Sequence, residues 1–182
     1  MSGQANVSVG YYSLLSNITG SSDTAVGTSA AQNENAPNVV AVGYHAGVLH
    51  TIGYSTFVGA DAGDHATSGV GLTDIGYLAG SAETTAQKST VIGSNVGQTT
   101  FATGAGVILL GSGNVAVDTP AAGTSNYINV ENVWSATGTN TPSTSVTTIA
   151  GQLILPAPGT GIAASYACFT SGGQLISSAT AC

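Results

Sequence analysis

Few residues in this chain could do chemistry, and most of them stand alone. His45, His50 and His65 are the only imidazoles. One histidine per chain on a threefold axis would give a metal ion three ligands and an open position. No His-x-His pair is present, so the other interpretation places these histidines in loops or subunit contacts. We assign no metal site and no cofactor.

Two of the eight carboxylates, Asp61 and Asp64, lie close together in the sequence beside His65. No other acidic residues form such a dense cluster. A catalytic pair needs two such groups at a fixed separation in a cleft. The surface of a stacked-repeat protein, which the glycine spacing below predicts, offers little cleft. These two carboxylates are therefore interpreted as solvated charges in a loop. The GGxGxD calcium nonapeptide is absent, as are a nucleophile elbow with suitable partners and a phosphate loop followed by Lys. We therefore predict no catalytic residues and no enzyme activity.

Charge excludes further classes of function. Only 5% of the residues are charged, Lys88 is the sole Lys or Arg, and the net charge is −7. Binding to nucleic acid or to anionic membranes needs a basic surface. No apolar run approaches the roughly 20 residues that span a bilayer. We expect no nucleic-acid partner and no membrane insertion. So few charges also favour an oligomer that hides much of its surface.

A short motif recurs along the chain and sets its organisation. An aliphatic residue precedes a glycine seven times, at intervals of 16 to 18 residues. The seven pairs are Val9-Gly10, Val26-Gly27, Val42-Gly43, Val58-Gly59, Ile75-Gly76, Ile92-Gly93 and Leu110-Gly111. The third residue after the glycine is Ala30, Ala46, Ala62, Ala79 and Val96 in the five middle copies. Self-similarity at a fixed period indicates stacked repeats.

Each repeat predicts one coil of about 17 residues. The β-branched residues before the glycine alternate with period two, as in a short strand. The glycine supplies a positive φ or a close backbone approach at a corner, and polar residues form the connecting loop. The alternation predicts that a threonine column three residues before the glycine faces inward. Its members are Thr24, Thr56, Thr73 and Thr90.

A single coil is too poor in apolar bulk to fold alone. We expect one buried aliphatic anchor per coil, which contributes about 1.5–3 kcal/mol. Ordering the backbone costs about 1–2 kcal/mol for every residue. Stacked coils share a core and continuous hydrogen-bond ladders. The core of Val, Ala and Gly is still thin, which predicts packing against further chains.

The pattern x-Val/Ile-Gly-x-x-Ala-Gly over residues 7–115 resembles the left-handed β-roll heads of YadA-like trimeric adhesins. It is still more similar to repeats of phage tail fibres that precede an endosialidase-type intramolecular chaperone. The resemblance implies an all-β fold, with left-handed β-roll or β-solenoid coils in a parallel homotrimeric fibre and a small C-terminal β element. It also implies that small apolar residues lie inside and loops face water.

Three regions are expected: repeats over 1–118, a transition strand and Ser/Thr-rich linker over 119–148, and a C-terminal hairpin module over 149–182. Trp134 is predicted to plug a core or an interface, with ligand stacking as the alternative. Cys168 and Cys182 are predicted to form a disulfide, within or between chains. The C-terminal tail resembles the segment before the self-cleaving chaperone, which implies a mature fibre after autocleavage.

These features favour a structural fibre of a virion, a tail fibre or appendage that attaches to the host cell surface. The expected partners are two further copies, other virion proteins, and a host surface glycan or protein; the expected location is the virion or the extracellular space. The exposed tyrosines are candidate contacts, although their regular placement also fits a structural ladder. They are Tyr11, Tyr12, Tyr44, Tyr54 and Tyr77.

Two other functions remain open. A bacterial surface adhesin head would carry a signal peptide and a membrane anchor, and the opening residues MSGQANVSVG lack the basic and apolar regions of a signal peptide. An ice-binding solenoid would need a regular threonine ladder. Val7, Val40 and Ile108 interrupt the threonine column here, so this function ranks below the other two.

Overall fold

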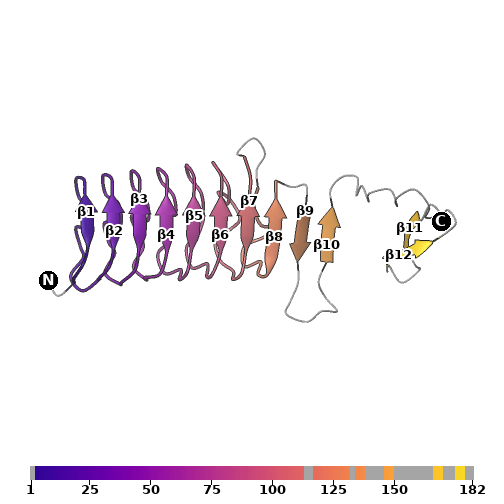
Figure 1. Cartoon of the computed structure of the whole chain (residues 1–182), viewed down its shortest axis with the longest axis horizontal. Helices are drawn as coiled ribbons and strands as arrows, with labels where there is room; N and C mark the ends of the chain where they lie inside the picture. The colour runs from indigo at the N-terminus through magenta and orange to yellow at the C-terminus, as the bar shows by residue number, and fades with distance from the viewer. Residues whose placement is uncertain are drawn as a thin grey trace, which may run out of the picture. The chain divides into compact units, whose positions relative to one another are not determined.

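The computed structural model describes residues 3–112 and 117–131, and the backbone of four later strands (Figure 1). The chain divides into two compact units, Met1–Ala150 and Gly151–Cys182. All the regular elements described are β-strands. In the described part of the chain, no helix is long and apolar enough to cross a membrane.

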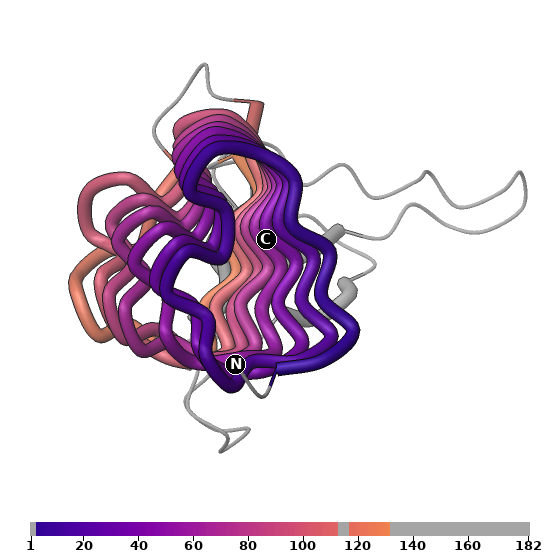
Figure 2. Tube along the Cα trace, turned by 90° about the vertical axis from the view of Figure 1, so that its left-hand side faces the viewer, coloured from indigo at the N-terminus to yellow at the C-terminus, as the bar shows by residue number. Residues whose placement is uncertain are grey.

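The first unit is a β-solenoid, which confirms the predicted coil stack. Its repeats contribute β1 (Val7–Val9), β2 (Thr24–Val26), β3 (Val40–Val42), β4 (Thr56–Val58), β5 (Thr73–Ile75), β6 (Thr90–Ile92) and β7 (Ile108–Leu110). Each strand pairs in parallel with the next, and equivalent repeat positions lie opposite each other, as Val9 does with Val26. Viewed along the stack, the coils overlie one another (Figure 2). We number them 1 to 7 in chain order.

The stack ends in a change of strand direction. Strand β8 (Tyr127–Val130) continues the parallel sheet beside β7. Strands β9 (Trp134–Thr137) and β10 (Val146–Ile149) then pair antiparallel. The ten strands form one sheet in chain order.

The glycine after each strand closes a corner that no other residue fits. Gly59 has a φ of +136°, a region that side chains of L-residues rarely enter. A Cβ added to Gly59 would lie 2.3 Å from the carbonyl oxygen of Gly76 in the next coil. The equivalent glycines of coils 1 to 6 all have φ between +125° and +138°. Both predicted reasons for glycine, positive φ and close backbone approach, are confirmed.

The interior of the stack is built from the middle residue of each strand and from the small residues after the glycine. The middle residues include Ala25, Ala41, Phe57, Val91 and Leu109, all fully buried. The small residues are Ala30, Ala46, Ala62, Ala79 and Val96, also fully buried. The largest interior ring, that of Phe57, packs where Gly47 and Gly63 have no Cβ. The predicted inward position of the small residues is thus correct.

The outward columns correct the sequence prediction. The residues one and three before the glycine face away from the interior, so the aliphatic anchor is not buried within its own coil and the threonine column does not face inward. Alternation with period two leaves open which set points inward. All three positions of these strands accept apolar or β-branched residues. The sequence therefore did not indicate which of the two alternating sets of side chains faces the interior.

The first coil replaces apolar interior positions with serine. Ser8 stands where later coils bury Ala, Phe or Val, and its hydroxyl donates to the carbonyl oxygen of Ser13 at 3.0 Å. A cavity of about 330 Å³ opens at this end, lined by Asn6, Asn17 and Leu14 among others. Polar replacement of the outermost rung is typical of solenoid ends that face water.

The second unit contains β11 (Tyr166–Phe169) and β12 (Leu175–Ser178), which pair antiparallel with Phe169 opposite Leu175. Their side chains and the segments around them lie outside the described residues. The predicted disulfide between Cys168 and Cys182 therefore stays a prediction, as does the role of Trp134.

Candidate interaction surface

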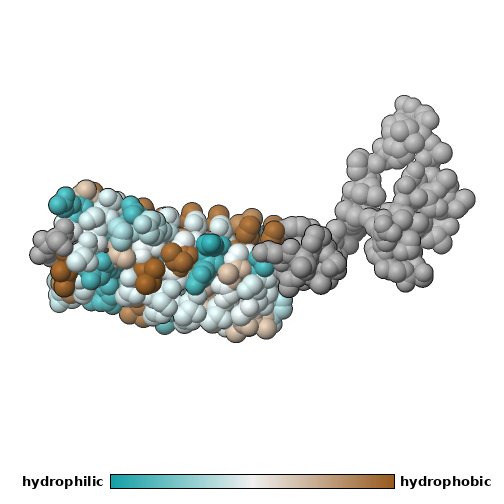
Figure 3. Space-filling view, turned by 90° about the horizontal axis from the view of Figure 1, so that it is seen from below, coloured by the Kyte–Doolittle hydropathy of each residue, from teal (hydrophilic) through white to brown (hydrophobic). Residues whose placement is uncertain are grey.

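The outward face of the parallel sheet carries an unbroken aliphatic column. It consists of the residues before the glycines, Val9, Val26, Val42, Val58, Ile75, Ile92 and Leu110. Ile75 and Ile92, in the middle of the stack, are 37% and 39% exposed. Apolar residues recur along the length of the stack (Figure 3). A contiguous apolar surface of this kind is typical of an interaction site.

A second column lies on the same face and widens it. Its members are Val7, Thr24, Val40, Thr56, Thr73, Thr90 and Ile108, three residues before each glycine. Neither column contains a charged residue. We call these two columns together the outward strand face.

A third column lies directly after the glycines and carries tyrosine in coils 1, 3 and 5. Tyr11, Tyr44 and Tyr77 are 65%, 51% and 52% exposed. Thr28, Ala60 and Ser94 occupy the coils between and next to them. Backbone hydrogen bonds tie the column together, such as that from the Asp61 N–H to the Tyr44 carbonyl. Two of these rings pack against the next residue in the chain: Tyr11 against Tyr12 and Tyr44 against His45, each with ring centroids 3.8 Å apart.

The three histidines do not meet. His45 lies 3.6 Å from Asp61, and His65 lies 3.0 Å from Asp64, both near the surface. His50 is fully buried. No three His, Cys, Asp or Glu side chains within the described ranges are grouped as a metal site would require. All three histidines lie outside the strands, as expected of loop residues, but the side chain of His50 is buried, whereas His45 and His65 lie in turns near the surface.

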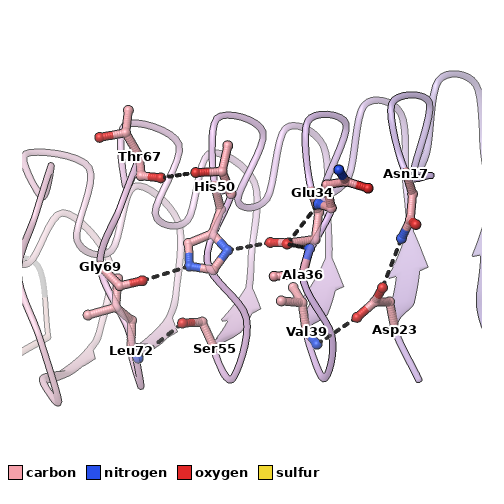
Figure 4. A network of polar contacts seen from close by, with 12 residues as sticks. Asn17, Asp23, Glu34, Ala36, Val39, His50, Ser55, Thr67, Gly69 and Leu72 are labelled. Atoms are coloured by element: carbon pink, nitrogen blue, oxygen red, sulfur yellow. Dashed lines mark hydrogen bonds and ion pairs between the residues drawn. The ribbon is translucent and has the colours of Figure 1, made fainter. Parts of the chain in front are cut away.

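A column of mostly polar residues, seven residues after each glycine, runs along the stack and was not predicted from the sequence. From coil 1 to coil 7 its members are Asn17, Glu34, His50, Ala66, Glu83, Thr100 and Asp118. Asn17 donates to Asp23 at 2.9 Å, and Asp23 also accepts from the Val39 N–H at 3.0 Å (Figure 4). Aligning the repeats beyond the alanine and glycine positions would have revealed this column.

Glu34 and His50 form a closed pair between coils 2 and 3. The Nδ1 of His50 lies 2.5 Å from Oε2 of Glu34, and its Nε2 donates to the Gly69 carbonyl oxygen at 3.0 Å (Figure 4). The other oxygen of Glu34 accepts the N–H groups of Asn35 and Ala36. Both side chains are fully buried. The pair resembles a catalytic dyad in its geometry, but it has no surface to meet a substrate, so it links coils.

Asp74 and Glu83 form a second buried acidic pair, within coil 5. Both are fully buried, and their four carboxyl oxygens have no donor from any other described residue. Burial raises the pKa of both groups well above the ordinary range. The nearby Asp74 charge raises the pKa of Glu83 further, and so does a hydrogen bond between the two carboxyl groups, which forms when one of them holds a proton.

Two other carboxyl groups show how hydrogen bonds oppose burial. Burial raises the pKa of Asp23 despite its bonds to Val39 and Asn17. At Asp118 burial also acts to raise the pKa, but bonds from Thr99 and Thr100 outweigh it, so the pKa is lowered.

No protein-family model matches this chain, and neither does any curated protein or solved structure. The fold and the surfaces described above are therefore the grounds for a functional proposal.

Proposed function

We propose that this chain is one strand of a homotrimeric fibre, in which the outward strand faces of three copies pack together. The observation that supports this most directly is the outward strand face itself. It has no charged residue, and its aliphatic column continues over seven coils. The fibre would be a virion appendage that attaches to a host cell surface.

The physical argument begins with the sheet. Parallel sheets occur almost only where both faces are covered. Here the inner face is covered by the coil interior, whereas the outer face leaves aliphatic side chains in contact with water. Full burial of an exposed Val or Ile contributes about 1.5–3 kcal/mol, and covering the part of each side chain that is still exposed here would contribute a fraction of that. An interior of mostly Ala and Gly gives a lone coil stack little reserve, so covering this face would add substantially to stability.

Three copies in parallel suit the geometry of the face. A cyclic assembly closes on itself and leaves no open interface. Parallel chains would place equal coils at the same height, so each aliphatic column would meet a sister column along its full length. The resemblance to trimeric adhesin heads and phage fibres supports the number three. Loops and exposed tyrosines would then be left to contact a host glycan or protein and other virion proteins.

The test is the mass of the purified chain in solution by light scattering, with and without reductant. We expect three times the chain mass of 17.7 kDa. Ile75→Asp places a charge in the middle of the outward strand face and should yield monomers. Ser68→Asp adds the same charge at an exposed loop position and should remain trimeric. A monomeric wild-type chain at micromolar concentration would refute the trimer. A mass that changes with reductant would show that Cys168 and Cys182 link chains.

Ice binding is a second candidate function, because the threonine column faces outward. Thr24, Thr56, Thr73 and Thr90 lie on one side of a regular parallel sheet, next to aliphatic residues. A trimer would cover this same face, so the two functions exclude each other. Thermal hysteresis from a monomeric chain would support ice binding. A trimer without thermal hysteresis would support the fibre instead.

A further inference from the structure

The interior of coil 5 contains two carboxyl groups in uncharged surroundings. Asp74 is the middle residue of β5, and its neighbours in the sheet are Phe57 on β4 and Val91 on β6. Glu83 belongs to the polar column, where coils 4 and 6 have Ala66 and Thr100. The pattern of the neighbouring coils therefore predicts an apolar residue at the position of Asp74.

The backbone leaves room for the Asp74 carboxyl and little else. A Cβ on Gly80 would lie 2.7 Å from the carboxyl carbon of Asp74, and one on Gly63 would lie 2.9 Å from its Oδ2. Both glycines have positive φ, +65° and +57°. The carboxyl group thus occupies space that side chains would otherwise fill, and the backbone closes around it.

Two ionised carboxylates cannot share this interior at low cost. Burying a charge without donors is strongly unfavourable, and a second negative charge adds repulsion. Glu34 avoids both costs through two backbone N–H groups and an imidazole. Asp74 and Glu83 have no such donors among the described residues. The remaining way to neutralise the pair is a bound proton or a bound cation, and the tight backbone favours the proton.

We propose that Asp74 and Glu83 form a proton-binding site in coil 5, which holds at least one proton at neutral pH and loosens this coil when the proton leaves. The inference does not depend on the fibre, since the site lies inside one chain.

Within the described part of the chain, no other ionisable group acts on the pair from the elements packed against it. The sheet neighbours Phe57 and Val91 do not titrate, and neither do Ala66 and Thr100. In coil 4, Asp64 and His65 bind each other near the surface. Lys88, in the loop of coil 5, is exposed to solvent.

The direction of the pH effect follows from the raised pKa of both groups. The folded chain keeps protons that the unfolded chain releases above its ordinary carboxyl pKa of about 4. The contribution to stability is therefore complete below about pH 4 and falls as the pH rises. Coil 5 should be loosest in alkaline solution, where the folded chain also releases the proton.

The chain supplies its own reporter for this loosening. Lys88 is the only Lys or Arg, so trypsin has one cleavage site, five residues after Glu83. Wild type and Glu83→Gln are compared as full-length, folded protein at pH 8. Glutamine keeps the shape, carries no charge and can donate to Asp74. We expect cleavage at Lys88 to be about tenfold slower in the variant, the effect of one pKa unit on the opening equilibrium.

Lowering the pH to 6.5 should narrow this ratio, because a lower pH favours the protonated pair in the wild type. Asp61→Asn removes the same charge near the surface and should cleave at the wild-type rate. Equal rates for wild type and Glu83→Gln at both pH values would overturn the proposal.

Two further arms keep the test decisive. If Glu83→Gln does not fold, the double variant Asp74→Ala with Glu83→Ala replaces it, since Ala25, Ala41 and Ala66 fill the equivalent positions of other coils. Its slower cleavage at pH 8 would support the site, and wild-type cleavage would refute it. Addition of calcium chloride tests the cation. If calcium slowed cleavage of the wild type at Lys88 but not that of the variant, the site would bind a metal ion, and the proposal of a proton-binding site would be overturned.

Discussion

Two regions of the solenoid bury acidic side chains at equivalent depth, but they solve the problem of charge differently. In coils 2 and 3, Glu34 has an imidazole and two backbone donors. In coil 5, Asp74 and Glu83 have no hydrogen-bond donor from any other described residue. Both regions occupy the same narrow interior, so depth alone does not decide the outcome.

The comparison shows that a buried acidic residue of the polar column is stabilised when the next coil places a hydrogen-bond donor beside it. The residue after Glu34 in the polar column is His50, one coil along, whereas the residue after Glu83 is Thr100, and Ala66 precedes it. A rung with a donor next to it links coils together. A rung without one depends on the proton concentration of the solution.

The largest effect is expected from His50→Ala. It removes the imidazole and leaves the buried Glu34 with its backbone donors alone, which should lower the free energy of unfolding by about 3–5 kcal/mol. Urea unfolding at pH 7, followed by circular dichroism, measures it. His65→Ala, at an exposed position, should change the value by less than about 0.5 kcal/mol. Similar losses in both variants would mean that the buried pair is not special.

The opposite sign is expected when the coil 5 pair is removed. Asp74→Ala with Glu83→Ala removes both buried carboxyl groups and should raise the free energy of unfolding by about 1–4 kcal/mol at pH 7. The same urea titration applies. A destabilised double variant would indicate that the two carboxyls have partners, and the contrast between the two regions would disappear.

A smaller loss is expected at the first rung, from Asn17→Ala. Asp23 would lose the amide that donates at 2.9 Å but keep the Val39 N–H. Removing one donor from a buried acceptor costs about 1–3 kcal/mol. Gln87→Ala, an exposed amide, is the matched control. Thermal unfolding should show a lower midpoint for Asn17→Ala alone.

The smallest effect is expected from Asp118→Asn, and its pH dependence should run opposite to that of coil 5. The pKa of Asp118 is lowered by bonds from Thr99 and Thr100 despite burial. Its contribution is therefore present above the unfolded carboxyl pKa of about 4 and is lost as the pH falls. Because the group is partly exposed, we expect a loss of about 1 kcal/mol at pH 7. Unfolding of wild type and variant from pH 7 to pH 3 should converge in acid.

Much of the fold was predictable because the repeat is local. The interval between glycines indicated the coil length, and the corner glycines and interior alanines follow from steric limits within one or two coils. The phase of the outward columns was not predictable. Val58 and Thr56 are as acceptable inside a sheet as outside it, and only the path of the whole coil turned Phe57 inward.

The polar column escaped prediction for a different reason. Glu34 and His50 are 16 residues apart, and nothing in either residue signals the other until the coils are stacked. Asp61 and Asp64 looked like a cluster because they are close in sequence, yet Asp61 lies against His45 of the preceding coil. Contacts between coils follow the register of the stack more than proximity along the chain.

The amino-acid sequence alone determined the period, the glycine corners and the scarcity of charge, because each depends on residue type and spacing. The tertiary structure alone decided which aliphatic and threonine side chains face water and which acidic groups lose it. The reason is physical: burial and hydrogen-bond partners depend on where each coil places its neighbour, and that position exists only after the coils have stacked.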